Sequence, residues 1–115
     1  MKWYRKLYVG EKARKDRYRI VGRVKWRRPQ LDAYLITIAS NAQNLLDIYP
    51  ANTMLLRYFR KKDIFVLGIA HGYEEAVELA CHIVAQVYTD TGAFDIRSYI
   101  RKRQEEGSSK LAGYQ

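Results

Sequence analysis

The sequence predicts a small α/β domain with about three strands alternating with helices in a βαβαβα-like order, followed by a short C-terminal helix. Two segments carry this prediction: LITIASNAQNLL at 35–46 and VLGIAHGYEEAV at 66–77 both run from apolar residues through Ile-Ala into a polar turn and then into helix-compatible sequence. They are offset by 31 residues, and the same offset backwards reaches the apolar stretch KLYVG. A strand, a turn and a helix in about 30 residues is the spacing of a βαβ unit. We therefore expect strands near 3–9, 32–39 and 63–70.

The length and composition of the chain limit the number of domains that it can form. With 115 residues, 48% of them hydrophobic, it is long enough for one core and too short for two, and we expect residues 1–103 to form a single domain. Residues 104–115 are polar and aperiodic and contain glycine and serine, so they are predicted to be a disordered tail. No apolar run approaches the ~18 residues that a membrane span needs. The cationic N-terminus is not followed by the apolar stretch that a signal peptide would have. With a single cysteine, these features predict a cytoplasmic protein that has no disulfide and no membrane partner.

The clearest helix is predicted at 73–92, where apolar residues recur every three or four positions. Its glutamates cluster at the N-terminal end, where the helix dipole favours them, and Gly92 is the expected stop. Between the second and third strands the sequence also has helical character, but Pro50 disfavours a continuous helix. We expect a short helical turn before Pro50 and a separate helix over about 51–61. Asp95 is expected to cap the short C-terminal helix.

Residues 12–28 carry two competing patterns. As a strand over 17–27, the apolar residues would alternate with arginine and lysine with a period of two. As a helix, Ile20 and Val24 share a thinner apolar stripe, and Gly22 costs about 1 kcal/mol relative to alanine. The 31-residue spacing favours the helix, because a crossover helix here completes a regular pattern. A strand would instead make the fold α+β with an N-terminal hairpin.

A resemblance to a family of small uncharacterised proteins of anaerobic Gram-positive bacteria is carried by the stretches KLYVGE, ITIASNAQNLLDI and GIAHGYEEAVELA, followed by TGAFDIRSYI. It covers residues 2–102 and consists of hydrophobic strands and turns. The resemblance implies the alternating order of strands and helices with a helix at 12–28, and it implies no known activity.

The positive charge of the chain is concentrated at its N-terminal end. The net charge is +9, and residues 1–28 hold 12 of the 21 lysines and arginines with only two acids. Residues 29–115 hold 9 cations against 10 acids and are nearly neutral. A segregated basic segment predicts an acidic partner, such as nucleic acid, an anionic membrane surface or an acidic protein face. A membrane surface is disfavoured, because an interfacial helix needs a broader apolar face than 12–28 offers.

The basic segment predicts a non-enzymatic protein that binds the phosphate backbone of nucleic acid. Arginine engages phosphate oxygens through two parallel hydrogen bonds, and phosphate contacts alone read no base sequence. The expected contacts are Arg14, Lys15, Arg17, Arg19, Arg23, Lys25, Arg27 and Arg28. Tyr18 and Trp26 lie among them and are expected in the core rather than as stacking platforms. Two alternatives remain: a regulator or interaction module that binds an acidic protein surface, and a solvated basic face with no partner.

Other parts of the chain could extend this surface or pair with a second copy. Smaller basic clusters at 57–62 and 97–103 would enlarge the footprint if they lay on the same face as the first. A three-stranded sheet would also leave an exposed strand edge, which makes a homodimer possible.

The turns after the second and third predicted strands supply a weaker candidate site. If these strands are parallel, Ser40, Asn41 and His71 would meet at the carboxyl edge of the sheet, where α/β proteins bind ligands beside helix N-termini. No glycine-rich phosphate loop accompanies them, so a turn or capping role is the alternative for His71, and an enzyme here would need a pocket. No cofactor or metal is expected, because Cys81 and His82 are adjacent and would diverge on a helix by about 100°. Cys81 is predicted to lie in the core.

Overall fold

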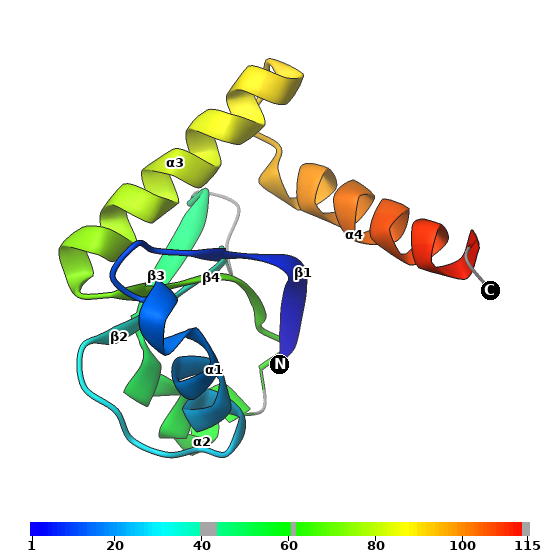
Figure 1. Cartoon of the computed structure of the whole chain (residues 1–115). Coiled ribbons are helices and arrows are strands. Elements are labelled where there is room, and N and C mark those ends of the chain that lie inside the picture. Colours follow the sequence, from blue (N-terminus) through cyan, green and yellow to red (C-terminus); the bar gives the residue numbers. More distant parts are fainter. Residues whose placement is uncertain (40–43, 61, 114–115) are drawn as a thin grey trace.

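The computed structural model describes residues 1–39, 44–60 and 62–113, and its centre is a mixed four-stranded sheet (Figure 1). The strands are β1 (Lys2–Val9), β2 (Ala33–Ile38), β3 (Leu46–Pro50) and β4 (Phe65–His71), and their order in the sheet is β1-β4-β2-β3. β4 pairs in parallel with β1 and antiparallel with β2, and β3 pairs antiparallel with β2. The predicted small α/β fold is therefore confirmed.

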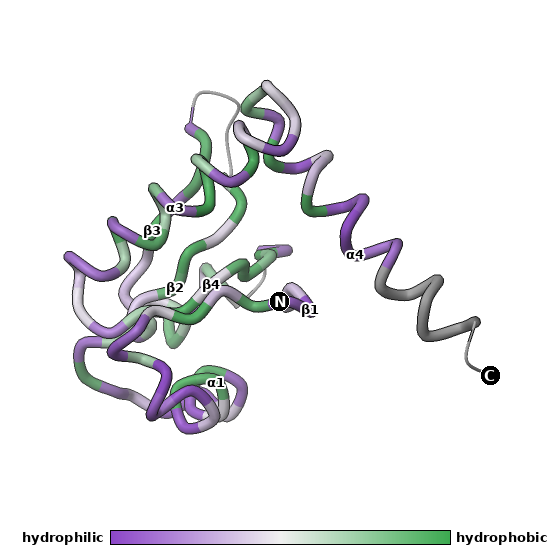
Figure 2. The backbone as a smooth tube through the Cα atoms, turned by 45° about the horizontal axis from the view of Figure 1, so that its top comes forward, coloured by the Kyte–Doolittle hydropathy of each residue, from purple (hydrophilic) through white to green (hydrophobic). Residues whose placement is uncertain are grey.

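Helices cover both faces of this sheet (Figure 1). One face carries the 3-10 turn η1 (Arg14–Asp16), α1 (Arg17–Lys25), the 3-10 helix η2 (Ala51–Leu55) and α2 (Arg57–Arg60), and the other carries α3 (Tyr73–Thr91) and α4 (Ile96–Gly113). Each face has its own apolar cluster, with Ile20 and Ile69 in the first and Leu67 and Ile83 in the second. In Figure 2 β2 and β4 are mainly green, whereas α1 carries both purple and green segments, as expected for a helix with one buried side.

The segment before Pro50 forms strand β3 rather than the predicted helical turn. Its residues face β2 in regular antiparallel register, with Ile48 opposite Ile36. Ile48 and Leu46 pack on the apolar cluster beneath α3 and α4, so strand pairing and burial together outweigh the local helical character. Pro50 ends an edge strand, a position in a sheet that accepts proline. After it, η2 and the four-residue α2 stand in place of the single helix predicted over about 51–61.

The 31-residue spacing does not mark a repeated βαβ unit. β1, β2 and β4 lie at the three predicted positions, so the apolar strand pattern was interpreted correctly. The predicted strand directions were wrong, because β2 pairs antiparallel with β3 and also antiparallel with β4. Among the described strands, the parallel pair is β1 with β4.

Residues 17–25 form α1, so the helical prediction for the basic segment is confirmed and the strand alternative is wrong. Ile20 and Val24, one turn apart, are buried against the sheet. Tyr18 and Trp26 were predicted to lie in the core, but their exposed fractions are 84% and 81%. The helical period explains the correction. Positions two before Ile20 and two after Val24 point away from the buried side of a helix, whereas a period of two would have placed all four side chains together.

Capping residues define the joint between α3 and α4. Gly92 has a φ of 74°, in the left-handed region that glycine tolerates, and its N–H donates to the carbonyl of Tyr88 at 2.7 Å. Asp95 accepts hydrogen bonds from the N–H and the hydroxyl of Ser98 at 3.2 and 2.8 Å, and these bonds lower the pKa of the Asp95 carboxyl. Both predicted caps are present. α4 continues to Gly113, past residue 104, and the division of the chain into a domain and a tail stays a prediction.

Hydrogen bonds of Tyr8, Tyr99 and Arg103 connect α4 to β1 and α3. Arg103 donates from Nη1 to the hydroxyl oxygens of Tyr8 at 3.3 Å and Tyr99 at 3.1 Å. The Tyr99 hydroxyl donates to Oδ2 of Asp90 at 2.5 Å, and the Tyr8 hydroxyl donates to Oε1 of Gln86 at 2.5 Å. Burial, together with the bond to Asp90, raises the pKa of Tyr99 to about 12. These bonds hold the first half of α4 against the domain, whereas Figure 1 shows its far end leading away from the sheet.

Candidate nucleic-acid interface

The eight cations predicted as contacts lie on one stretch of structure, which we call the α1 basic surface. Two of them are on η1, the next four are on α1, and two follow the helix: Arg14, Lys15, Arg17, Arg19, Arg23, Lys25, Arg27 and Arg28. All are exposed except Arg17, which is half-buried. Because Ile20 and Val24 take the buried side of α1, the cationic side chains occupy its flanks and its outer side. The structure thus brings the predicted residues together.

Contacts within this surface orient two of its arginines. Arg19 forms an ion pair with Asp16 at 3.0 Å, and Nη1 of Arg23 donates to the carbonyl of Pro29 at 3.0 Å. Arg19 and Arg23 are four residues apart and share one flank of the helix. A planar guanidinium can donate two parallel hydrogen bonds to a phosphate, so this flank offers two such groups one turn apart.

Two exposed aromatic rings lie among these cations. The guanidinium carbon of Arg17 is 5.7 Å from the centre of the Tyr18 ring, within the range of a cation–π contact. Trp26 directly precedes Arg27 and Arg28 in the chain. Aromatic rings beside cations can stack on unpaired bases while the cations hold phosphates. The exposure of both rings therefore adds stacking to the chemistry that this surface can perform.

Arg27 has a backbone conformation that usually belongs to glycine. Its φ is 55°, in the left-handed region. The N–H of Arg27 donates to the Val24 carbonyl at 3.2 Å and that of Arg28 to the Arg23 carbonyl at 2.8 Å, the pair of bonds that ends a helix in a Schellman motif. Glycine is preferred at this position, because the left-handed conformation costs a residue with a side chain roughly 1–2 kcal/mol. The chain thus keeps an arginine where glycine would relieve strain.

Replacing Arg27 with glycine is expected to raise the free energy of unfolding by about 0.5–1 kcal/mol. The strain energy that glycine relieves in the left-handed conformation is larger than the free-energy cost of the additional conformational entropy that glycine gives the unfolded chain. Urea denaturation followed by circular dichroism measures the change. Arg28→Gly is the matched control, because Arg28 is not among the described residues with positive φ, and it is expected to lower the free energy of unfolding. A lower free energy of unfolding in Arg27→Gly than in the unaltered protein would contradict this interpretation of the turn.

The predicted crevice of Ser40, Asn41 and His71 presupposes parallel strands, whereas β2 and β4 pair antiparallel. His71 lies opposite Ala33 at the start of β2, and Ile38 is at the other end of that strand. The crevice itself stays a prediction. Ser40 and Asn41 themselves lie outside the described residues.

His71 instead takes part in a turn centred on Glu75. The N–H of His71 donates to Oε2 of Glu75 at 2.6 Å, and the N–H of Lys12 donates to Oε1 of the same carboxylate at 2.5 Å. Gly10 leaves space for this carboxylate, since a Cβ there would overlap the Glu75 side chain. Glu75 therefore ties the segment before η1 to the junction of β4 and α3, which agrees with the turn role considered for His71.

The two smaller basic clusters lie on different faces of the sheet. Arg57 belongs to α2, which packs on the same face as α1, while the side chain of Arg60 and all of Lys61 lie outside the described residues. Arg97 and the cations that follow it belong to α4, which covers the opposite face. The three basic clusters therefore do not converge on one footprint.

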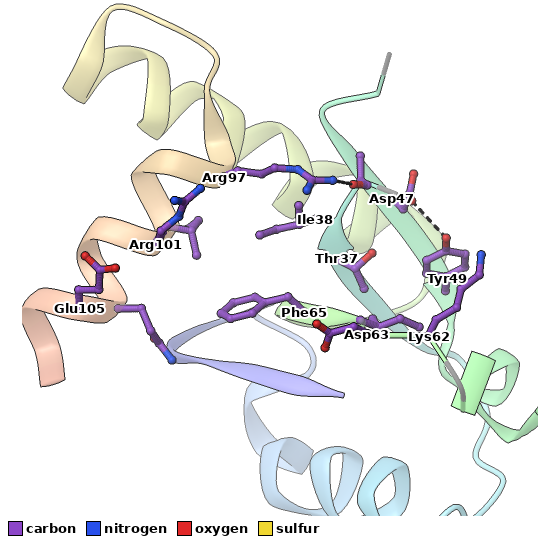
Figure 3. A pocket seen from close by; sticks show the side chains of 14 residues that line it. Thr37, Ile38, Asp47, Tyr49, Lys62, Asp63, Phe65, Arg97, Arg101 and Glu105 are labelled. Atoms are coloured by element: carbon purple, nitrogen blue, oxygen red, sulfur yellow. Dashed lines mark hydrogen bonds between the residues drawn. The ribbon is translucent and has the colours of Figure 1, made fainter. Parts of the chain in front are cut away.

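A pocket of about 670 Å³ lies between α4 and one end of the sheet (Figure 3). Arg97 and Arg101 line its α4 side, and Arg97 donates a hydrogen bond to the carbonyl of Ala39. Asp47 and Asp63 lie across from them, near the start of β4 (Figure 3). With Lys62 and Glu105 the lining holds three cations and three carboxylates. This balance of charge gives the pocket no preference for a polyanion. The structure describes all eight cations of the α1 basic surface, and none of them lines this pocket.

A second pocket, of about 270 Å³, adjoins the α1 basic surface, and we call it the Trp3 pocket. Residues from β1, the end of α1, η2 and α2 line it: Met1, Trp3, Val24, Lys25, Arg27, Met54 and Phe59. It was not predicted, because Trp3 and Phe59 are distant in sequence and no local pattern brings them together. The signal that the sequence did contain is the position of Lys25 and Arg27 at the end of an amphipathic helix.

Metal-binding groups, membrane-spanning helices and the single cysteine were also considered in the sequence. Within the described ranges, no group of three or more His, Cys, Asp or Glu side chains is placed to hold a metal ion. None of the helices in that part of the chain combines the length and the apolar character needed to cross a membrane. Cys81 is exposed on α3, so its predicted place in the core is wrong.

Comparison of the chain with protein-family models, with curated proteins and with solved structures finds no match. The resemblance of stretches such as KLYVGE and TGAFDIRSYI to a bacterial family stays a prediction.

Proposed function

We propose that this protein is a small, non-enzymatic nucleic-acid-binding protein that contacts the phosphate backbone through the α1 basic surface. The observation that carries the proposal is the exposure of seven of the eight cations on one helix and its flanking turns. These charges repel one another in the free protein. A polyanion relieves the repulsion, and the counterions that its phosphates release drive binding. A cytoplasmic location forms part of the proposal, because a single cysteine suits a reducing compartment.

A basic face that served only solubility would have a different composition. Solubility favours charges of both signs interspersed over a surface without apolar patches. Among the described residues of the α1 basic surface, Arg19 alone pairs with a carboxylate. Tyr18 and Trp26 also expose large rings there, which disfavours solubility. Unpaired cations beside exposed aromatic rings favour a binding surface over a solvated one.

A steep dependence of affinity on salt is the expected signature of this function. Fluorescence anisotropy of labelled single- and double-stranded DNA and RNA, titrated with the protein between ~50 and ~200 mM salt, measures it. Engagement of about five phosphates predicts that log affinity falls with log salt with a slope of roughly −4.5 on duplex DNA and roughly −3.5 on single strands. Absence of binding to all four nucleic acids at the low end of this range would refute the proposal.

Leu31 favours a second candidate, an interaction module that binds an acidic surface of a partner protein. Its exposed fraction is 87%, and it lies between Arg28 and β2. An aliphatic side chain adds nothing to phosphate binding, whereas apolar residues beside arginines are typical of protein interfaces. The same titration separates the two candidates, because an interaction module would bind generic nucleic acids poorly.

A further inference from the structure

We propose that the Trp3 pocket receives one unstacked nucleobase, so that the nucleic acid bound by the α1 basic surface is single-stranded. This inference rests on the proposed function and names the class of nucleic acid. Three observations carry it: the aromatic lining of the pocket, its size, and the two cations that it shares with the α1 basic surface.

Aromatic and apolar side chains form the walls of the Trp3 pocket. Trp3 on β1 and Phe59 on α2 supply rings, and Val24 and Met54 supply aliphatic surface. Every base has a π face and stacks on such rings with little regard to its identity. The lining therefore suits a base of any sequence, which agrees with a surface that holds phosphates without reading bases.

The size of the pocket limits what it can receive. Its volume of about 270 Å³ lies just below the ~300 Å³ at which pockets begin to hold drug-sized ligands. A single planar ring system is smaller than such ligands and fits this range. The pocket thus matches one base rather than a whole dinucleotide or a stacked pair.

Two cations belong both to this pocket and to the α1 basic surface. Lys25 and Arg27 line the pocket, and Nζ of Lys25 is 5.7 Å from the centre of the Trp3 ring. Arg27 occupies its place at the pocket with a φ of 55°, the conformation that would favour glycine. A strand that places a phosphate on these two cations presents the adjoining base to the pocket. Ligand contact therefore supplies a reason for an arginine at this strained position.

A paired base cannot enter the pocket without leaving its stack. Extrusion from a duplex costs the pairing and stacking energy of that base, whereas a single strand offers the base without this cost. The Trp3 pocket therefore predicts tighter binding of a single strand than of a duplex with the same number of phosphates.

The test compares strands with and without bases. An oligothymidine and an abasic oligonucleotide of equal length carry the same number of phosphates. We expect the oligothymidine to bind roughly 5- to 150-fold more tightly in anisotropy titrations, the range for one base stacked on an aromatic side chain. In Trp26→Phe protein, Trp3 is the remaining tryptophan, and oligothymidine but not the abasic strand is expected to quench its fluorescence.

Variants of the lining locate the effect. Trp3→Leu and Phe59→Leu are each expected to remove most of the preference for oligothymidine and to leave the salt slope unchanged. Tyr73→Leu is the matched control, because Tyr73 is an exposed aromatic residue on α3, across the sheet from the pocket. Equal affinity for both strands, with salt-dependent binding retained, would overturn the pocket inference and leave the proposed function standing. No binding of either strand by the unaltered protein would overturn the pocket inference, and the proposed function would fall with it only if duplex DNA and RNA also failed to bind.

Discussion

Loss of four cations from the α1 basic surface is expected to lower nucleic-acid affinity by at least about 100-fold at ~50 mM salt and to flatten the salt slope by about 3 to 4. The variant changes four neighbouring residues to alanine: Arg23, Lys25, Arg27 and Arg28. Each neutralised phosphate adds roughly 0.9 to the slope on duplex DNA and roughly 0.7 on single strands, so the change in slope tells how many phosphates the variant no longer engages. Anisotropy titrations at several salt concentrations measure affinity and slope together.

Two paired variants separate local contact from overall charge. Arg27 and Arg28 changed together, or Arg101 and Lys102 changed together, each remove two adjacent exposed cations. The first pair belongs to the α1 basic surface and is expected to flatten the slope by about 1.8 on duplex DNA and about 1.4 on single strands. The second pair is on α4, across the sheet, and is expected to have little effect. Equal effects of the two pairs would mean that only net charge matters, and would contradict the assignment of the interface to α1.

Truncation of Ile20 to alanine is expected to lower the free energy of unfolding by about 2–5 kcal/mol, and truncation of Tyr18 by less than about 0.5 kcal/mol. The two residues are neighbours on α1, but the Ile20 side chain is 3% exposed within the apolar cluster that includes Leu35 and Ile69, whereas Tyr18 faces solvent. Removing buried methyl groups forfeits their transfer energy and leaves a cavity. Urea denaturation of the two variants measures both costs.

This pair of variants also tests the helical period of the basic segment. A strand would place Tyr18 and Ile20 on the same face and would make the two truncations similarly costly. Comparable reductions in stability would therefore contradict the helix. Ile20→Val provides the scale, with an expected cost of about 0.5–1.5 kcal/mol, because it removes one methyl group from the same site.

Local patterns predicted those parts of the fold whose determinants lie close together in sequence. The caps of α3 and α4 depend on Gly92 and Asp95, which act on residues within four positions of themselves. The apolar runs of β1, β2 and β4 likewise identify strands without knowledge of their neighbours. For α1, the spacing of Ile20 and Val24 favoured the helix, although the same residues also fitted a period of two.

The parts that were predicted wrongly depend on partners distant in sequence. The residues of β3 have a helical pattern alone, and only their pairing with β2 and burial under α3 and α4 make them a strand. The direction of β2 relative to β4 follows from that same hairpin. The crevice of Ser40, Asn41 and His71 was predicted on the assumption that β2 and β4 are parallel. That assumption was wrong, because residue types at strand ends do not reveal whether the strands run in parallel.

The sequence predicted the charged residues of the candidate interface but not the shape of its surface. A run of arginines and lysines is visible in the sequence, and any helix that buries Ile20 and Val24 must expose them. The exposure of Trp26 depends on where α1 ends, which the Schellman turn at Arg27 decides. The Trp3 pocket depends on the approach of Phe59 to β1, between segments that no local pattern connects.

The place of β4 in the sheet sets the order in which this fold can be completed during synthesis. β4 lies between β1 and β2 but follows both along the chain, whereas β2 and β3 form a hairpin of neighbouring segments. β1 has to wait for its partner until residues 65–71 have left the ribosome, and closing that long loop carries an entropic cost before pairing rewards it. Ile20 and Val24 join Val66 and Ile69 in the same apolar cluster only at that moment. A nascent chain that stops short of β4 therefore has no partner for β1, and α1 lacks the residues of β4 with which Ile20 and Val24 share an apolar cluster.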